Sequence, residues 1–286
     1  MRSDRGWLCV KWGDWLKASG AVIVGLVLDI AAHGLVPNAT GALSADGVQV
    51  LAPSAIVTVG LMVPALLGFL LITFGLLEVV FVMLQSELPY GKWLKGFVFG
   101  MSFGGIWYLG VLESTLVLGT AFGRELVAGL SDAIPILVMC VLLGGLVGTQ
   151  GRARRRQPGS TVLAVPIVAL CYLMGRYVAY LVFNIESGAA GHPVGTLVWT
   201  SAMGLCVGLM YWLLEPGLGE ASPARRAIVF GGVVYGIDWA LFNFFLVVLF
   251  QMNTLDLMTR VGVDVFSVML GVLIAETAMR AGKRPS

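Results

Sequence analysis

The chain has few charged residues, almost no histidine and no long polar segment. Only 12% of its 286 residues are Asp, Glu, Lys or Arg, and only two are His. The gaps between its apolar segments are too short for a soluble kinase, nucleotide-binding or receptor domain. Any chemistry must therefore take place inside or beside a lipid bilayer.

The sequence also lacks the motifs of several membrane-bound enzymes. It has no HExxH motif, no aspartate-rich prenyltransferase motif and no histidine-rich box for a di-iron centre. Only one of its histidines, His33, lies in an apolar segment, and His192 lies in a gap, which speaks against a haem held by two histidines. The GxSxG spacing around Ser102 stands in an apolar segment without a histidine, which favours helix packing over a nucleophile elbow. We expect no cofactor.

The four cysteines add no metal or redox site. The chain contains no CxxC pair, and three of its cysteines lie in apolar segments, where the thiol packs as a small apolar group. These residues are Cys140, Cys171 and Cys206, and the fourth is Cys9. We expect neither a disulfide nor a cysteine-bound metal.

Eight long apolar segments dominate what the sequence does contain. Hydrophobic residues make up 58% of the chain. Each segment is close to or longer than the roughly 20 residues that a helix needs to cross about 30 Å of hydrocarbon. The segments are residues 19–37, 54–84, 96–118, 128–149, 161–184, 195–214, 227–251 and 261–279. This pattern predicts an all-α polytopic membrane protein with eight transmembrane helices in a lipid bilayer.

The basic residues lie mostly in alternate gaps, and this predicts the orientation. Those on one side are Arg2, Arg5, Lys11, Lys17, Lys92, Lys95, Arg152, Arg154, Arg155, Arg156, Arg225, Arg226, Arg280, Lys283 and Arg284. Only Arg124 and Arg260 fall in the opposite gaps, and Arg176 lies inside the fifth segment. Because Lys and Arg near helix ends stay on the cytoplasmic side, we expect both termini to be cytoplasmic, in a plasma or inner membrane. The basic residues are divided among short segments, which speaks against nucleic-acid binding.

The two halves of the chain resemble each other. Residues 95–120 align without gaps onto 226–251, an offset of 131, with seven identical positions. With one residue inserted in the following loop, Asp132 then aligns with Asp264. A weaker match upstream aligns Leu35, Val36 and Asn38 with Leu181, Val182 and Asn184, an offset of 146. We therefore predict two parallel four-helix repeats, related by a pseudo-twofold axis along the membrane normal, with the interface between them as the default place for a site.

This duplication defines the predicted organisation of the chain. Residues 1–18 form a cytoplasmic interfacial amphipathic segment, with Trp12, Trp15 and Leu16 on its apolar stripe. The other parts are a first repeat at 19–149, a basic cytoplasmic linker at 150–160, a second repeat at 161–281 and a cytoplasmic tail at 282–286. Glycine pairs with GxxxG spacing mark the expected close helix contacts: Gly100 and Gly104, Gly204 and Gly208, and Gly232 and Gly236.

Ionisable side chains inside the segments are the candidate site residues, because each costs at least about 2.5–3.5 kcal/mol to insert. Those in the outer half of the membrane are Asp29, His33, Glu113, Asp132, Arg176, Asn243 and Asp264, while Asp238 lies near the midplane. One interpretation is an outward-facing acidic cavity that binds a cation or exchanges protons.

The other interpretation of these groups is structural. Arg176 would pair with Glu113 or Asp29, and Asp132 and Asp264 would be helix N-caps. Asp29 and His33 are four residues apart and could both bind a metal, but one such pair is weak support, and we predict no metal site.

Three function classes fit these observations. A small transporter or permease for a solute or ion, possibly proton-coupled, accounts for the repeat and the acidic cavity. An accessory or scaffold subunit of a larger membrane complex accounts for the packing glycines and the interfacial amino-terminal segment without assigning chemistry to the acidic residues. A membrane-embedded enzyme acting on a lipid or quinone is the third class, although no nucleophile and base can be assigned, so an enzyme is the less favoured prediction. A homo-oligomer or a membrane-complex partner is compatible with each.

Overall fold

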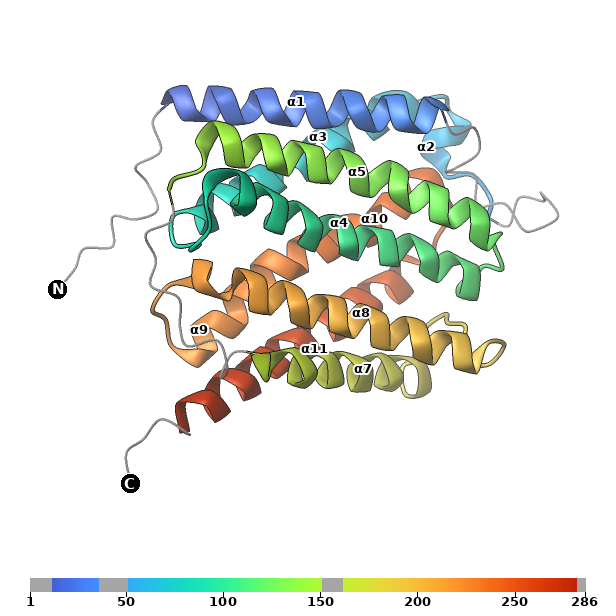
Figure 1. Cartoon of the computed structure of the whole chain (residues 1–286). Helices are drawn as coiled ribbons and strands as arrows, with labels where there is room; N and C mark the ends of the chain where they lie inside the picture. The colour runs from blue at the N-terminus through green and yellow to red at the C-terminus, as the bar shows by residue number, and fades with distance from the viewer. Residues whose placement is uncertain (1–11, 36–50, 151–161, 282–286) are drawn as a thin grey trace.

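The structure is a computed structural model that describes residues 12–35, 51–150 and 162–281 (Figure 1). Eight of its helices are long and apolar enough to cross a membrane, which confirms the predicted fold class. They are α1 (Trp12–Leu35), α3 (Met62–Gln85), α4 (Lys92–Val117), α5 (Phe122–Val147), α7 (Ala164–Leu181), α8 (Pro193–Leu214), the continuous helix formed by α9 (Pro223–Ala227), η2 (Ile228–Tyr235) and α10 (Gly236–Leu249), and α11 (Thr254–Ala281).

Successive spanning helices run in opposite directions. The start of α1 and the end of α11 lie at one end of the bundle, on the left in Figure 1. We call this end the terminal side and the opposite end the distal side. Helices α4 and α9 begin on the terminal side, whereas α5 and α11 begin on the distal side.

Several helix boundaries differ from the predicted segments. The second span begins at Met62, after the separate short helix α2 (Ala55–Thr58) and Gly60, whose φ of 78° breaks the helix. Helices α5 and α11 start earlier than the apolar segments do, because they include polar residues that are buried against other helices.

Helix α1 is continuous from Trp12, so Trp12, Trp15 and Leu16 belong to the first spanning helix. The remainder of the predicted interfacial segment lies outside the described residues. The same is true of nearly all of the predicted 150–160 linker, of the 282–286 tail, and of Val36 and Asn38 in the upstream alignment.

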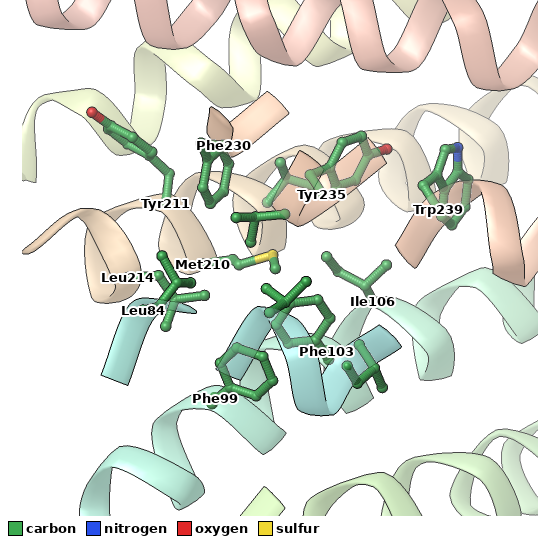
Figure 2. Close-up of a cluster of buried hydrophobic side chains, with 14 of the residues drawn as sticks. Leu84, Phe99, Phe103, Ile106, Met210, Tyr211, Leu214, Phe230, Tyr235 and Trp239 are labelled. Carbon is green, nitrogen blue, oxygen red and sulfur yellow. The ribbon is translucent and has the colours of Figure 1, made fainter. Parts of the chain in front are cut away.

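The two halves of the bundle meet along four helices. Helix α4 packs against α8, and α10 packs against α3. Figure 2 shows the apolar side chains that fill much of this interface. They are Leu84, Phe99, Phe103 and Ile106 from the first half, and Met210, Tyr211, Leu214, Phe230, Tyr235 and Trp239 from the second. The core is dense here; for example, the ring centroids of Phe99 and Phe103 are 4.3 Å apart.

Two of the three predicted glycine pairs form close helix contacts. A Cβ at Gly100 would lie 2.9 Å from Cα of Leu137 in α5. Gly104 faces the same helix, and Gly204 and Gly208 face α7 in the same way. These glycines therefore let the helix backbones approach closely.

The third predicted pair is wrong in one member, because residues 228–235 form a π-helix. Hydrogen bonds from i to i+5 widen each turn beyond the 3.6 residues of an α-helix, which changes the residues that share one face. Gly231 and Gly236 consequently face α11, whereas a Cβ at Gly232 would have no atom nearer than 3.9 Å.

Helix contacts recur in the two halves at constant sequence offsets. Gly25 of α1 packs on Met139 of α5, and Val168 of α7 packs on Gly271 of α11. Gly25 and Val168, each in the first helix of its half, are 143 positions apart in the sequence. Met139 and Gly271, each in the fourth helix of its half, are 132 positions apart. The upstream offset of 146 that the sequence suggested takes Gly25 to Cys171, which also lies beside Gly271, so this contact is compatible with both offsets.

A second pair of contacts has the same fourth-helix offset. Gly100 meets Leu137, and Gly231 meets Met269, which lies 132 positions after Leu137. The same offsets also relate two surface grooves, one between α1 and α5 and the other between α7 and α11.

Candidate functional site

The predicted site residues form two separate clusters on the distal half of the bundle. The first cluster consists of Asp29 and His33 of α1 and Asp132 of α5. Nε2 of His33 lies 3.3 Å from a carboxylate oxygen of Asp132. Nδ1 of His33 lies 3.0 Å from the carbonyl oxygen of Asp29, one turn earlier in α1, and 3.7 Å from the Asp29 carboxylate.

A cavity of about 70 Å³ adjoins the first cluster. His33, Asp132 and Glu125 line it on one side, and Trp107 and Phe242 line it on the other. No Lys or Arg is among the described residues that line it. The first cluster is therefore acidic and faces a space large enough for water or a small ion.

The second cluster is a network of balanced charges. Arg176 of α7 lies 2.9 Å from a carboxylate oxygen of Glu113 in α4, and its Nε lies 2.8 Å from a carboxylate oxygen of Asp264 in α11. Arg260 lies 2.7 Å from the same Glu113 carboxylate. The expected pairing of Arg176 with Glu113 is confirmed, while the alternative partner Asp29 lies in the first cluster.

Aromatic side chains enclose the second cluster. The Arg176 guanidinium is fully buried and lies 5.1–5.6 Å from the ring centroids of Tyr172, Trp199 and Trp239. The indole N–H of Trp239 donates to Asp264 over 2.7 Å. The guanidinium groups of Arg176 and Arg260 face the carboxylates of Glu113 and Asp264, and Arg260 also lies 3.6 Å from the Asp256 carboxylate, so each desolvated charge has a partner of opposite sign.

Asn243 lies beside the second cluster. With Glu113 and Arg260, it lines a cavity of about 40 Å³. Its side-chain amide donates to the carbonyl oxygen of Trp239 over 2.8 Å.

The two clusters occupy corresponding positions in the two halves. An offset of 143 takes Asp29 to Tyr172 and His33 to Arg176, and an offset of 132 takes Asp132 to Asp264. His33 contacts Asp132 and, four residues earlier on its own helix, the carbonyl oxygen of Asp29. Arg176 likewise contacts Asp264 and, four residues earlier, the hydroxyl of Tyr172. The second half has a guanidinium where the first half has an imidazole.

Asp238 lies alone behind the cavity. It is 1% exposed, and one of its carboxylate oxygens accepts a hydrogen bond of 2.8 Å from the indole of Trp107. Its other oxygen has no hydrogen-bond partner among the described residues. Because Trp107 also lines the cavity, its indole stands between the cavity and this carboxylate.

Asp132 and Asp264 are not helix N-caps. Helix α5 begins at Phe122 and α11 at Thr254, so each aspartate lies ten positions inside its helix. The backbone N–H groups near them are hydrogen-bonded within the helix. Their carboxylates instead contact His33 of α1 and Arg176 of α7, respectively.

Three further site residues were missed in the sequence. Arg260 and Glu125 were assigned to gaps, because the apolar segments begin a few residues after them. Arg260 lies one helical turn before Asp264, and Glu125 lies two turns before Asp132. This spacing is the sequence feature that could have identified them. Trp107 could not be recognised from the sequence, because its contact with Asp238 is between distant segments.

Two basic residues on the terminal side are also buried, although the sequence indicated only topology for them. Nζ of Lys95 donates to the Gln85 carbonyl oxygen and, over 3.1 Å, to the Thr149 hydroxyl. Arg226 forms ion pairs with Glu215 and Glu276. Lys95 and Arg226 are aligned at the offset of 131, and each joins the start of its helix to the end of the preceding one.

Comparisons with protein families, with curated proteins and with solved structures found no match. A functional proposal therefore depends on the site geometry.

Proposed function

We propose that this protein is a membrane permease for a small cation, with the access path on the distal side. The observation that carries the proposal is the cavity lined by His33, Asp132 and Glu125, with no Lys or Arg among the lining residues that the structure describes. Each carboxylate buried in a bilayer costs about 2.5–3.5 kcal/mol or more unless it is compensated. A cation taken from solution would supply the missing compensation.

The contrast between the clusters supports this assignment. Arg176 and Arg260 neutralise Glu113 and Asp264, which suits a structural role in joining α4, α7 and α11. In the first cluster, His33 is the one basic side chain that the described part of the chain places against Asp29 and Asp132. We therefore assign cation binding to the first cluster and helix orientation to the second.

A tandem duplication is part of the proposal. The recurring contacts at offsets of 143 and 132 support two parallel four-helix repeats related by a pseudo-twofold axis. Asp238 and Trp107 come from different repeats and meet at their interface. A permeation path between the repeats would pass this pair.

Asp238 is the proposed second station on that path. Its carboxylate lies one side chain behind the cavity and has one oxygen without a hydrogen-bond donor. On the terminal side of it, the apolar core of Figure 2 fills the interface between the halves. The structure then corresponds to a state closed on the terminal side, and transport would require α3 and α4 to move relative to α8 and α10.

The basic residues of the terminal side support a cytoplasmic location for that side, by the positive-inside rule. The cavity would then open toward the outside of a plasma or inner membrane. Cations would be taken up first by the cluster at His33 and Asp132.

Solid-supported-membrane electrophysiology on proteoliposomes tests the proposal. We expect transient currents after a concentration jump of at least one cation in a panel of H⁺, Na⁺, K⁺ and Co²⁺. Asp132→Asn and Asp238→Asn should each reduce the current at least tenfold, because each removes a carboxylate from the path. Glu220→Gln is the matched control, since Glu220 is an exposed loop carboxylate.

Absence of current for every cation in the panel would overturn the proposal. Currents that persist unchanged in both aspartate variants would overturn the assigned path. Native mass spectrometry of the protein from its own membrane should show a lone chain or homo-oligomer, and a stoichiometric second protein would favour the accessory-subunit interpretation instead.

A further inference from the structure

We infer that Asp29, His33 and Asp132 form a binding site for a divalent first-row transition-metal ion. The inference deepens the proposed function, on which it rests for the role of the ion, because it names the chemical class of the cation. One donor atom from each side chain lies within 4.8 Å of the others.

The hydrogen bonding of His33 directs a lone pair at Asp132. Nδ1 of His33 is 3.0 Å from the Asp29 carbonyl oxygen, which can only accept, so Nδ1 carries the proton. In the neutral imidazole, Nε2 is then an acceptor. It faces another acceptor, the Asp132 carboxylate, at 3.3 Å. Two acceptors in contact need a proton or a metal ion between them, and a metal ion could bind both at once.

This arrangement is the usual second shell of a metal-bound histidine. A backbone carbonyl that accepts from Nδ1 fixes the tautomer and the ring orientation and leaves Nε2 for the metal. The separation of 3.3 Å between Nε2 and the carboxylate oxygen matches that of two ligands roughly 2.0–2.1 Å from one tetrahedral ion.

In the other half of the protein, the guanidinium of an arginine side chain occupies the position that corresponds to the proposed metal ion. Arg176, at the position that corresponds to His33, places its guanidinium against Asp264, which corresponds to Asp132. The guanidinium lies within a bundle of low polarity and remains charged, because Arg is protonated under all ordinary conditions. The first half has an aspartate at the corresponding position and a second carboxylate, at Asp29, and no Lys or Arg of the described residues is paired with either.

The donor set selects the kind of ion. One imidazole nitrogen with two carboxylates suits Zn²⁺, Co²⁺, Mn²⁺ or Fe²⁺, whereas an all-oxygen set would suit Mg²⁺ or Ca²⁺. Glu125 lines the same cavity, and it or a water can complete the coordination. The side chain of Asp29 is 6% exposed and that of His33 20%, so the site is shielded yet open to the cavity.

Titration with Co²⁺ tests the inference, since this ion reports its coordination through visible d–d absorption. The full-length protein is purified in detergent, freed of any affinity tag and of chelator, and titrated with CoCl₂. We expect one Co²⁺ per chain. His33→Ala and Asp132→Asn should weaken binding at least about tenfold, because loss of even an outer-shell partner has this effect. His192→Ala, which removes the only other histidine, should leave binding unchanged.

The variant His33→Arg distinguishes loss of the metal site from loss of folding. This change gives the first half the guanidinium that the second half already has, so the protein should keep or raise its melting temperature and lose Co²⁺ binding. A wild-type protein that binds no Co²⁺ would overturn the inference. Binding that is equally strong in the His33 and Asp132 variants would also overturn it.

The outcomes separate this inference from the proposed function. Co²⁺ binding in detergent without any current in proteoliposomes would keep the metal site and overturn the permease. Proton currents that depend on Asp132, in a protein that does not bind Co²⁺, would keep the permease and overturn the metal site.

Discussion

At the scale of single residues, the two clusters differ in how their buried charges are compensated. Arg176 contacts Glu113 and Asp264 at once and is fully buried. Without Arg176, the buried Asp264 carboxylate would lose the guanidinium at 2.8 Å and Glu113 would keep Arg260, and breaking a buried ion pair in this way is strongly destabilising. If the second cluster has a structural role, the stability of the protein should therefore depend on Arg176.

Arg176→Met should destabilise the protein strongly. The expected loss is about 3–5 kcal/mol, because Glu113 and Asp264 lose their shared guanidinium. The melting temperature, followed by the intrinsic fluorescence of the eight tryptophans, should fall by roughly 10 °C.

Arg225→Met is the matched control for this measurement, since Arg225 is exposed in the first turns of α9. It should change the melting temperature by about 1–2 °C or less. An equally small change for Arg176→Met would contradict the structural role assigned to the second cluster.

The sequence identified the residues of both clusters except Arg260, but it did not identify their grouping. Ionisable side chains inside apolar segments are costly, so they were recognisable without a structure. Which carboxylate meets Arg176 depends on the rotation of α4, α7 and α11 about their axes, and the apolar pattern around these helices does not fix that rotation. Depth alone placed Asp29 and Glu113 in one group, although they lie in different clusters.

At the scale of helices, the π-helix η2 decides which glycines face α11. In an α-helix, Gly232 and Gly236 would share a face, as the GxxxG spacing predicts. In η2, Gly231 replaces Gly232 in the interface, and a Cβ there would lie 2.9 Å from the backbone nitrogen of Met269. Two adjacent glycines thus have opposite environments.

Gly231→Ala should therefore be costly and Gly232→Ala should not. A methyl group at Gly231 would overlap the backbone of α11, and we expect a loss of roughly 1–3 kcal/mol. At Gly232 the nearest atom to a Cβ would be the Met269 sulfur, at an ordinary contact distance of 3.9 Å, so alanine should be neutral or stabilise the helix by up to about 1 kcal/mol. Thermal unfolding of the two variants measures the difference, and the reverse order would contradict the π-helical register.

Helix existence was predictable from the sequence, whereas helix ends and register were not. Long apolar segments gave all eight spans, because only an internally hydrogen-bonded helix suits the bilayer core. The starts of α5 and α11 were missed, since buried polar residues such as Glu125 and Arg260 look like loop residues when the sequence alone is read. The π-helix leaves no signal in hydropathy, because it changes the period of a segment that is apolar on every side.

At the scale of the whole molecule, the proposed permease depends on which side of the membrane the acidic cavity faces. The cavity lies on the distal side, and the proposed orientation places this side outside the cell. The net charge of +2 is small, so the argument rests on where the basic residues lie and not on their number. Inverting the protein would leave the fold unchanged and would make the first cluster a site for release into the cytoplasm, or for capture from it.

Labelling of single cysteines in intact cells decides between the two orientations. In a background without Cys9, Cys140, Cys171 and Cys206, we would introduce Gly191→Cys on the distal side and Glu220→Cys on the terminal side, both at exposed positions. If the orientation that the positive-inside rule predicts is correct, a membrane-impermeant maleimide should label Gly191→Cys in intact cells and Glu220→Cys only after permeabilisation. The opposite pattern would place the cavity in the cytoplasm, and a cation would then reach Asp132 and His33 from within the cell, with Asp238 as the station nearer the outer, closed half of the path.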